Sequence, residues 1–98
     1  MEIDYSKKFL KDLKKLKKTD AIIYKKIREL CFNKLTDYKL ISDILNSKKM
    51  RNYDDYYRIR IGDYRIGLKR VPSDKIKKQA KIQLLRVLHR KDIYKYFP

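Results

Sequence analysis

The strongest constraint on the fold is a run of alternating apolar and basic side chains that begins at Tyr57. Ile59 and Ile61 continue the apolar series, and Arg58 and Arg60 occupy the positions between. Successive side chains of a β-strand point to opposite faces, so this period of two predicts a strand. One face of that strand is apolar, and the other carries arginines.

A second strand is predicted directly after the first. Gly62 interrupts the run, and the alternation resumes at Tyr64 and Ile66 with Arg65 between them. Glycine adopts the positive φ that a tight hairpin turn often requires, so the pattern predicts two antiparallel strands joined at Gly62. Arg65 adds a third guanidinium to the polar face. The two predicted strands are residues 56–61 and 64–70.

The residues before this hairpin are predicted to form a short strand and two helices. Residues 1–5 alternate as a first strand, and Ser6 is a suitable N-cap for a helix over 6–18 with apolar residues at helical spacing. A second amphipathic helix is predicted over 20–34. The short link between them implies an antiparallel helical hairpin.

Two further regions complete the expected architecture. Residues 35–55 are predicted to form a short helical turn or a packed loop, with turn residues at both ends and Met50 docked into the core. Residues 71–78 are a polar connection. The nearly continuous apolar run over 82–88 is typical of a strand buried on both faces.

The order of elements indicates an α+β fold: an antiparallel sheet with the N-terminal helical hairpin packed on one face. No repeat or long linker is visible, so residues 1–98 are predicted to form a single domain. A chain of this length buries only a modest core.

Charge is the strongest indication of function. The chain has 28 basic and 12 acidic residues, a net charge of +16. Such a field favours a polyanionic partner, with nucleic acid first and an acidic protein or an anionic membrane behind it. A lysine-rich composition typical of the source organism is the alternative explanation. Residues 57–98 hold six of the eight arginines, and arginine binds phosphate through two parallel hydrogen bonds.

Several classes of protein are disfavoured by the residue inventory. A single cysteine, Cys31, permits no internal disulfide and fits a reducing cytoplasm. No apolar run approaches the roughly 18 residues of a membrane span, and no signal peptide is apparent. One histidine and one cysteine make no zinc cluster, and the two glycines make no phosphate-binding loop. We therefore expect a cytoplasmic protein with no cofactor and no metal.

The remaining reactive residues suit attack on RNA by its own ribose. In that reaction the 2′-hydroxyl attacks the neighbouring phosphate, and negative charge grows on the phosphorane. Arginines stabilise this charge, and tyrosines stack on exposed bases or donate hydrogen bonds.

Three segments carry a resemblance to a known family. Lys49–Arg51, Tyr57–Ile66 and Leu85–Tyr94 resemble, in order and spacing, the RelE/ParE toxin superfamily, and the RelE branch most of all. The resemblance implies a compact RelE-like microbial RNase fold. It also implies an endoribonuclease (mRNA interferase) that cleaves mRNA in the ribosomal A site without metal. The implied partners are the ribosome, mRNA and a cognate acidic RelB-type antitoxin.

The resemblance also implies roles for individual residues. Arg58 and Arg60 fall where the family places basic residues, one of which acts as base while the other stabilises the transition state. Arg65 matches a phosphate-binding arginine. Arg90 matches a C-terminal arginine that binds phosphate and assists the leaving group, and Tyr94 matches a tyrosine that contacts or stacks on the substrate.

Two departures from the family pattern affect the proton-transfer step. Relatives often have lysine where this chain has Arg58 and Arg60, and arginine is a poor general base because its pKa exceeds about 12. Leu88 replaces a glycine that is common in relatives. The first departure favours His89 for proton transfer, because its reference pKa lies near 6.5, and leaves the identity of the general base open.

Other interpretations remain open at this stage. A ParE-like inhibitor of DNA gyrase and a non-catalytic RNA-binding protein fit the same fold and charge. Arg58 and Arg60 are also compatible with an ordinary solvated strand face, and Arg65 with an ion pair to a carboxylate. His89 alternatively hydrogen-bonds a backbone carbonyl at a strand end, and Tyr94 seals the edge of the core.

Overall fold

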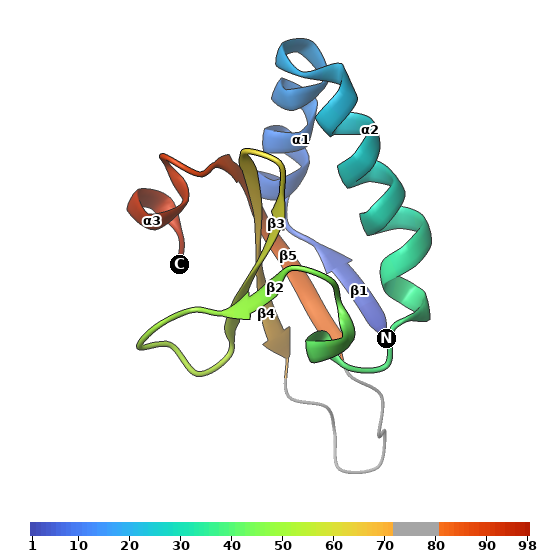
Figure 1. The fold of residues 1–98 in the computed structure, drawn as a ribbon, viewed down its shortest axis with the longest axis vertical. Helices are drawn as coiled ribbons and strands as arrows, with labels where there is room; N and C mark the ends of the chain where they lie inside the picture. The colour runs from blue at the N-terminus through green and yellow to red at the C-terminus, as the bar shows by residue number, and fades with distance from the viewer. Residues whose placement is uncertain (72–80) are drawn as a thin grey trace.

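The computed structural model describes residues 1–71 and 81–98. It consists of one five-stranded sheet with α1 and α2 on one face and the short α3 on the other (Figure 1). The strand order across the sheet is β1-β5-β4-β3-β2. The strands are β1 (Glu2–Tyr5), β2 (Ser47–Lys49), β3 (Tyr56–Ile61), β4 (Tyr64–Val71) and β5 (Lys81–His89). The α-helices are α1 (Lys7–Thr19), α2 (Ala21–Glu29) and α3 (Ile93–Tyr96).

The predicted N-terminal helical hairpin is confirmed, together with both of its caps. The Ser6 side chain accepts a hydrogen bond from the Phe9 N–H at 3.0 Å, and Asp20 accepts one from Ile23 at 3.1 Å. Each cap satisfies a backbone donor that the first turn of a helix leaves free. Helix α2 continues into a π-helical turn over Leu30–Lys34, so the predicted extent of the second helix also holds.

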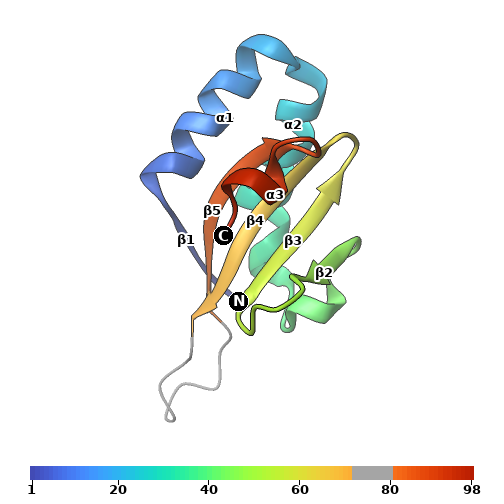
Figure 2. The same cartoon turned by 90° about the vertical axis from the view of Figure 1, so that its left-hand side faces the viewer.

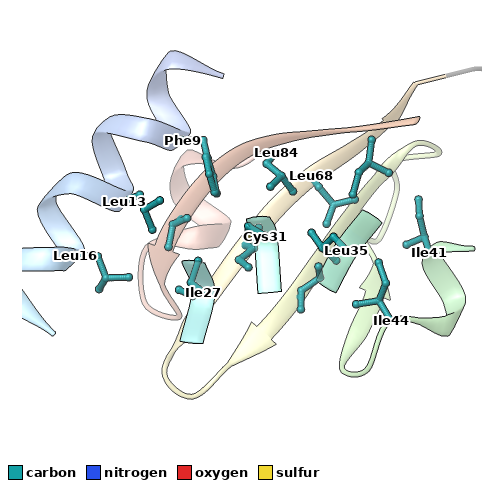
Figure 3. Packing of buried hydrophobic residues seen from close by; sticks show 14 residues of the cluster. Phe9, Leu13, Leu16, Ile27, Cys31, Leu35, Ile41, Ile44, Leu68 and Leu84 are labelled. Atoms are coloured by element: carbon teal, nitrogen blue, oxygen red, sulfur yellow. The ribbon is translucent and has the colours of Figure 1, made fainter. Parts of the chain in front are cut away.

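The main core fills the space between the two helices and the sheet. Phe9, Ile27 and Leu35 come from the helical side and meet Ile59 and Leu68 from the sheet, each with at most 1% of its surface exposed. Figure 3 shows side chains of this core from both layers, with Phe9, Ile27 and Leu35 on the helical side and Leu68 on the sheet. Burial on this scale supplies most of the stability of a small domain. The apolar face predicted from the alternation is therefore the face under the helices.

Strands β3 and β4 form the predicted antiparallel hairpin. Ile59 lies opposite Ile66, and Arg60 lies opposite Arg65. Gly62 has a φ of 57°, the left-handed conformation that favours glycine at a turn. The hairpin thus buries its apolar face against the helices and turns its arginines to the other side of the sheet.

Strand β5 pairs with β1 on one side and β4 on the other, and it contains a bulge. Leu84 lies opposite Leu68, but Arg86 lies opposite Gly67, which leaves Leu85 as the extra residue. An inserted residue reverses the inward and outward alternation beyond it. Val87, three residues after Leu84, is therefore buried in the same core.

A second, smaller apolar cluster covers part of the arginine-bearing face. Met50, Ile93 and Phe97 form it, as predicted for Met50. The Phe97 ring lies over Gly67, where an added Cβ would come within 2.8 Å of its atoms. Leu85 packs against this cluster, so β5 is covered on both faces as expected. Figure 2 shows α3 crossing in front of the sheet on this face.

The structure differs from the predictions in the sheet and at two elements. The sheet is mixed rather than antiparallel, because β1 pairs with β5 in parallel while the other strand pairs are antiparallel. Strand β2 and helix α3 were not predicted. The turns before and after β2 were predicted, and Asn46 and Asn52 in these turns adopt positive φ. Apart from Val71, the predicted polar connection over 71–78 lies outside the described residues. None of the helices in the described segments is long and apolar enough to cross a membrane.

Candidate functional site

Three arginines lie together on the face of the sheet opposite the helical hairpin. Arg60 and Arg65 are direct cross-strand partners, and Arg58 lies two residues before Arg60 on the same face of β3. Directly opposed side chains on one face of a sheet have Cβ atoms about 5 Å apart. Three guanidiniums are thereby held close together, although their charges repel.

Arg65 is the most constrained of the three. Its Nη1 donates hydrogen bonds to the carbonyls of Gly62 and Tyr64, each at 3.0 Å. Partial burial, followed by the charges of Arg58 and Arg60, lowers the pKa of Arg65 below its ordinary value. The side chain is fixed by the turn it spans and lies in a positive field. A bound anion would relieve that repulsion.

Arg90 joins this group from the turn after β5. Its N–H donates to the Asp63 carbonyl at 2.7 Å, and its Nε lies 3.8 Å from an Asp63 carboxylate oxygen. The charge of Arg90 also contributes to the lowered pKa of Arg65. A cavity of about 410 Å³ is lined by Arg60, Arg65 and Arg90 together with Asp63. The two predicted phosphate-binding arginines therefore share one concave site.

Tyr94 reaches the same site from helix α3. Its ring lies 5.9 Å from the guanidinium carbon of Arg58, and the side chain is 64% exposed. The neighbouring Ile93 is fully buried and Phe97 nearly so, which anchors the short helix on the sheet. Tyr94 therefore does not seal the core edge, whereas Phe97 does. The exposed Tyr94 ring is free to stack on a base.

The structure does not bring His89 to the arginine face. His89 lies directly opposite Tyr64 at the end of β5, and their rings meet edge to face at 5.4 Å. Tyr64 packs against the main core under the helices, so His89 shares that side. The His89 Nδ1 also accepts a hydrogen bond from the Lys91 N–H at 3.1 Å, which occupies one of its two nitrogens.

Five of the six predicted site residues are thus grouped, and the chemistry of the group suits a phosphate flanked by a base. Arg58, Arg60, Arg65 and Arg90 supply positive charge, and Tyr94 supplies an aromatic surface. Fixed cations of this kind stabilise charge that grows on a phosphorane. Among residues 1–71 and 81–98, no three His, Cys, Asp or Glu side chains gather into a group suited to a metal ion.

Two residues beside the site were missed by the sequence reasoning. Asp63 was assigned only to the turn, yet its carboxylate faces Arg90. Tyr53 follows the Lys49–Arg51 motif and lines a second cavity with Arg58. The available signal was an aromatic residue directly after Asn52, a residue type typical of turns. The structure confirms the turn, because Asn52 has a positive φ.

Comparison with known proteins places this chain in a family. Residues 3–94 match a family model described as the ParE toxin of the type II toxin–antitoxin system parDE. Toxin RelE3 of Methanocaldococcus jannaschii is 45% identical over 100 residues, which cover the whole of both chains.

Solved structures agree with the fold. The RelB–RelE antitoxin–toxin complex from Methanococcus jannaschii contains a chain with a TM-score of 0.69 and 37% identity, covering 97% of this chain and 99% of that one. The RelBE2 toxin–antitoxin complex from Mycobacterium tuberculosis aligns with a TM-score of 0.63 at 22% identity, covering 91% and 96%. At that lower identity the likeness concerns the fold alone.

Proposed function

Because this chain belongs to the RelE/ParE superfamily of type II toxins, we propose that it is a toxin that cleaves mRNA on the ribosome. The observation that carries the proposal is the grouping of Arg58, Arg60, Arg65 and Arg90 beside the exposed ring of Tyr94. A protein that acts only by binding another protein has no need of three guanidiniums around one concave site with a fourth, that of Arg58, beside them. This function places the protein in the cytoplasm, with the ribosomes.

The proposed reaction is an attack by the ribose 2′-oxygen on the adjacent phosphorus. The 2′-hydroxyl loses its proton to solvent as the P–O2′ bond forms, and the leaving O5′ takes a proton from solvent as the P–O5′ bond breaks. The products are a 2′,3′-cyclic phosphate and a 5′-hydroxyl. Arg60, Arg65 and Arg90 bind the non-bridging oxygens and stabilise the dianionic phosphorane. Tyr94 stacks on a base next to the scissile phosphate and keeps the 2′-oxygen in line with the leaving oxygen.

Proton transfer is the step for which the site offers the fewest groups. The chain's one histidine lies on the helix side of the sheet. We therefore propose that His89 transfers no proton and instead holds the turn before Arg90 in position. Its Nδ1 and its carbonyl accept hydrogen bonds from Lys91 and Asp92, which fixes the turn that carries Arg90. Positioning and electrostatic stabilisation then supply most of the rate enhancement, without a bound metal.

A translating extract tests the proposal directly. Purified protein added to ribosomes programmed with a defined mRNA is expected to cut it at codon positions and to leave 2′,3′-cyclic phosphate or 3′-phosphate ends. The Arg65→Ala/Arg90→Ala double variant serves as the inactive control. Intact mRNA on stalled ribosomes would refute the endonuclease function.

The description of the matching family favours a second candidate, inhibition of DNA gyrase, since the matched model is that of ParE. That function requires a protein-binding surface and no phosphate-cleaving group. A supercoiling assay separates the two candidates: loss of gyrase activity with mRNA left intact would favour the ParE-like function. The 45% identity to a protein named RelE and the arginine grouping support mRNA cleavage.

The expected partner is a small acidic antitoxin of the RelB type, because the related archaeal toxin was solved with RelB. A cavity of about 750 Å³ between α1 and α2 is lined by Lys17, Tyr24, Arg28 and the exposed ring of Phe32. Basic side chains around exposed aromatics suit an acidic amphipathic segment. A neighbouring reading frame for a small acidic protein is expected, and co-expression with its product should yield a stable complex that no longer cleaves mRNA.

A further inference from the structure

A second cavity, of about 740 Å³, opens beside the arginine cluster and shares Arg58 and Tyr94 with the site described above. It lies between the 48–54 segment and helix α3, on the same side of the sheet as the arginines. Its volume falls within the roughly 300–1,000 Å³ typical of ligand sites. The lining side chains that matter are Lys48, Lys49, Arg51, Tyr53, Arg58 and Tyr94.

The charge of this cavity suits an anionic ligand. Four of those six residues are cationic, and the one carboxylate in the lining belongs to Asp54. Asp54 lies 3.9 Å from Lys49, with the Asp54 side chain fully exposed and that of Lys49 about half exposed. An exposed ion pair of this kind contributes little. Lys49 is therefore available to a phosphate.

Aromatic contacts fix the Tyr53 ring at the edge of this cavity. Tyr53 packs edge to face on Tyr56 at 5.8 Å, and Tyr56 packs in the same way on the buried Phe97, also at 5.8 Å. Asn52, with φ 68°, closes the turn, and the Tyr53 N–H donates to the Met50 carbonyl at 3.4 Å. Tyr53 is nevertheless 47% exposed, so part of the ring is free.

Two tyrosines thus line the cavity, one on each of its walls. Tyr94 comes from α3 and already lies next to Arg58, whereas Tyr53 comes from the turn before β3. Bases stack on aromatic rings whatever their identity, and successive bases of a single strand are read by successive rings. Rings separated by a cationic floor suit two neighbouring nucleotides joined by a phosphate.

We propose that this cavity is a second nucleobase subsite, in which Tyr53 stacks on the nucleotide next to the one held by Tyr94. Lys48 and Lys49 neutralise the phosphate between the two bases. The inference rests on the proposed action on RNA and adds a residue that determines how the strand is seated. Whether Tyr53 holds the 5′ or the 3′ neighbour is an outcome of the experiment.

The experiment measures stacking without cleavage. A five-nucleotide RNA with 2′-O-methyl groups cannot be cut, and 2-aminopurine placed at each position in turn loses fluorescence when it stacks. The wild-type protein is expected to quench two adjacent positions. Tyr53→Ala is expected to abolish quenching at one of them, to keep it at the other, and to weaken binding about 5- to 100-fold.

Matched variants control for folding and for aromatic surface in general. Tyr53→Phe keeps the ring and is expected to behave as the wild type. Tyr96→Ala removes another exposed tyrosine, 62% exposed against 47% for Tyr53. Tyr96 does not line this cavity, so this variant is expected to change nothing. Melting temperatures of all variants show whether the fold is retained.

The outcomes separate this inference from the endonuclease function. If wild-type protein cleaves mRNA while Tyr53→Ala binds and quenches like the wild type, the subsite is refuted and the endonuclease stands. If no mRNA is cut but quenching at one position still depends on Tyr53, the subsite stands and the endonuclease fails. The subsite is also refuted if the wild-type protein quenches no position. It is refuted as well if an antitoxin peptide fills the cavity and the protein still quenches the RNA.

Discussion

At the scale of single residues, the decisive feature is that Arg65 is held in place against the charge of its neighbours. Two carbonyl hydrogen bonds at 3.0 Å fix the guanidinium, while Arg58, Arg60 and Arg90 surround it with like charge. An arrangement that repels itself in the free protein becomes favourable when an anion binds. Folding already overcomes the repulsion among these arginines, so no further reorganisation is needed when the anion binds, as expected of a preorganised electrostatic site.

Arg65→Ala is therefore expected to separate activity from stability. Loss of two partly exposed hydrogen bonds destabilises the fold by about 1 kcal/mol, and relief of the repulsion offsets part of that. The melting temperature should change by only a few degrees. Cleavage on the ribosome should fall roughly 100-fold or more, as when one donor to a developing charge is removed. A collapse of the melting temperature would instead indicate that Arg65 mainly fastens the hairpin.

His89→Gln tests the residue that was expected to transfer a proton but lies on the opposite side of the sheet from the arginines. If His89 only positions the turn before Arg90, the variant should slow cleavage modestly and leave the pH–rate profile unchanged between about pH 6 and 8. The measurement is single-turnover cleavage across that range. A profile that flattens near pH 6–7 in the variant would restore His89 to proton transfer.

At the scale of elements, the site depends on how the C-terminal segment docks on the sheet. Gly67→Ala would place a methyl group within 2.8 Å of the buried Phe97 ring. Overpacking of this kind costs about 1–3 kcal/mol. Phe97 anchors α3, so displacement of its ring moves Tyr94 away from Arg58. Cleavage should decline more than stability alone explains.

The matched control for this variant is a compensating substitution. Gly67→Ala combined with Phe97→Leu reduces the crowding and should restore part of the lost activity in the same cleavage assay. Wild-type activity and melting temperature in the single variant would contradict the proposed docking. So would a double variant that shows the sum of two independent losses.

A second test at this scale concerns the contact between α1 and β5. Strand β1 pairs with β5 only as far as Leu84. Beyond that point Asp12 takes over: it binds Arg86 at 2.7 Å and accepts from the Val87 N–H at 3.0 Å. Both charged side chains are mostly buried. Asp12→Ala should cost about 2–3 kcal/mol, a fall of roughly 10–20 °C in melting temperature.

Asp4→Ala is the control for that prediction. It removes the partner of Lys81 at 3.1 Å, but both side chains are substantially exposed. Such a pair contributes less than about 1 kcal/mol. Equal losses of stability in the two variants would show that Asp12 acts only as a surface charge.

Elements with their own periodicity could be predicted from the sequence, and elements that depend on tertiary contacts could not. The β3–β4 hairpin and both long helices follow from alternation, helical spacing and caps. Strand β2 is three residues long at the edge of the sheet, with two exposed lysines and no apolar alternation. Helix α3 is a single turn held by the burial of Ile93 and Phe97.

The same limit explains the position of His89. Counted by twos from the buried Ile82 and Leu84, His89 falls on the arginine side of the sheet. The bulge at Leu85 reverses that parity, so Val87 and His89 face the helices instead. No residue near Leu85 predicts a bulge from the sequence. The bulge arises from tertiary contacts, because the pairing of β5 with β1 ends at Leu84 and the Val87 N–H donates to Asp12 instead. The grouping of Arg58, Arg60 and Arg65, by contrast, needed only the regular hairpin.

At the scale of the whole molecule, the net charge of +16 raises the question of whether binding depends on local contacts or on the overall field. Helices α1 and α2 carry many lysines on the side of the sheet away from the site. A diffuse field attracts RNA to any face, whereas a site releases a fixed number of counterions. Each phosphate contact to single-stranded RNA contributes roughly −0.7 to the slope of log K against log salt.

Two double variants with the same loss of charge distinguish these explanations. Arg60→Ala/Arg90→Ala removes two proposed phosphate contacts and should reduce the steepness of the slope by about 1.4 for a short single-stranded RNA. Lys25→Ala/Lys26→Ala removes two exposed cations of α2 and should leave the slope nearly unchanged. Affinity is measured by fluorescence anisotropy between about 50 and 200 mM salt. Equal changes of slope in both variants would mean that the RNA responds to total charge, and that the arginine face holds no defined phosphate.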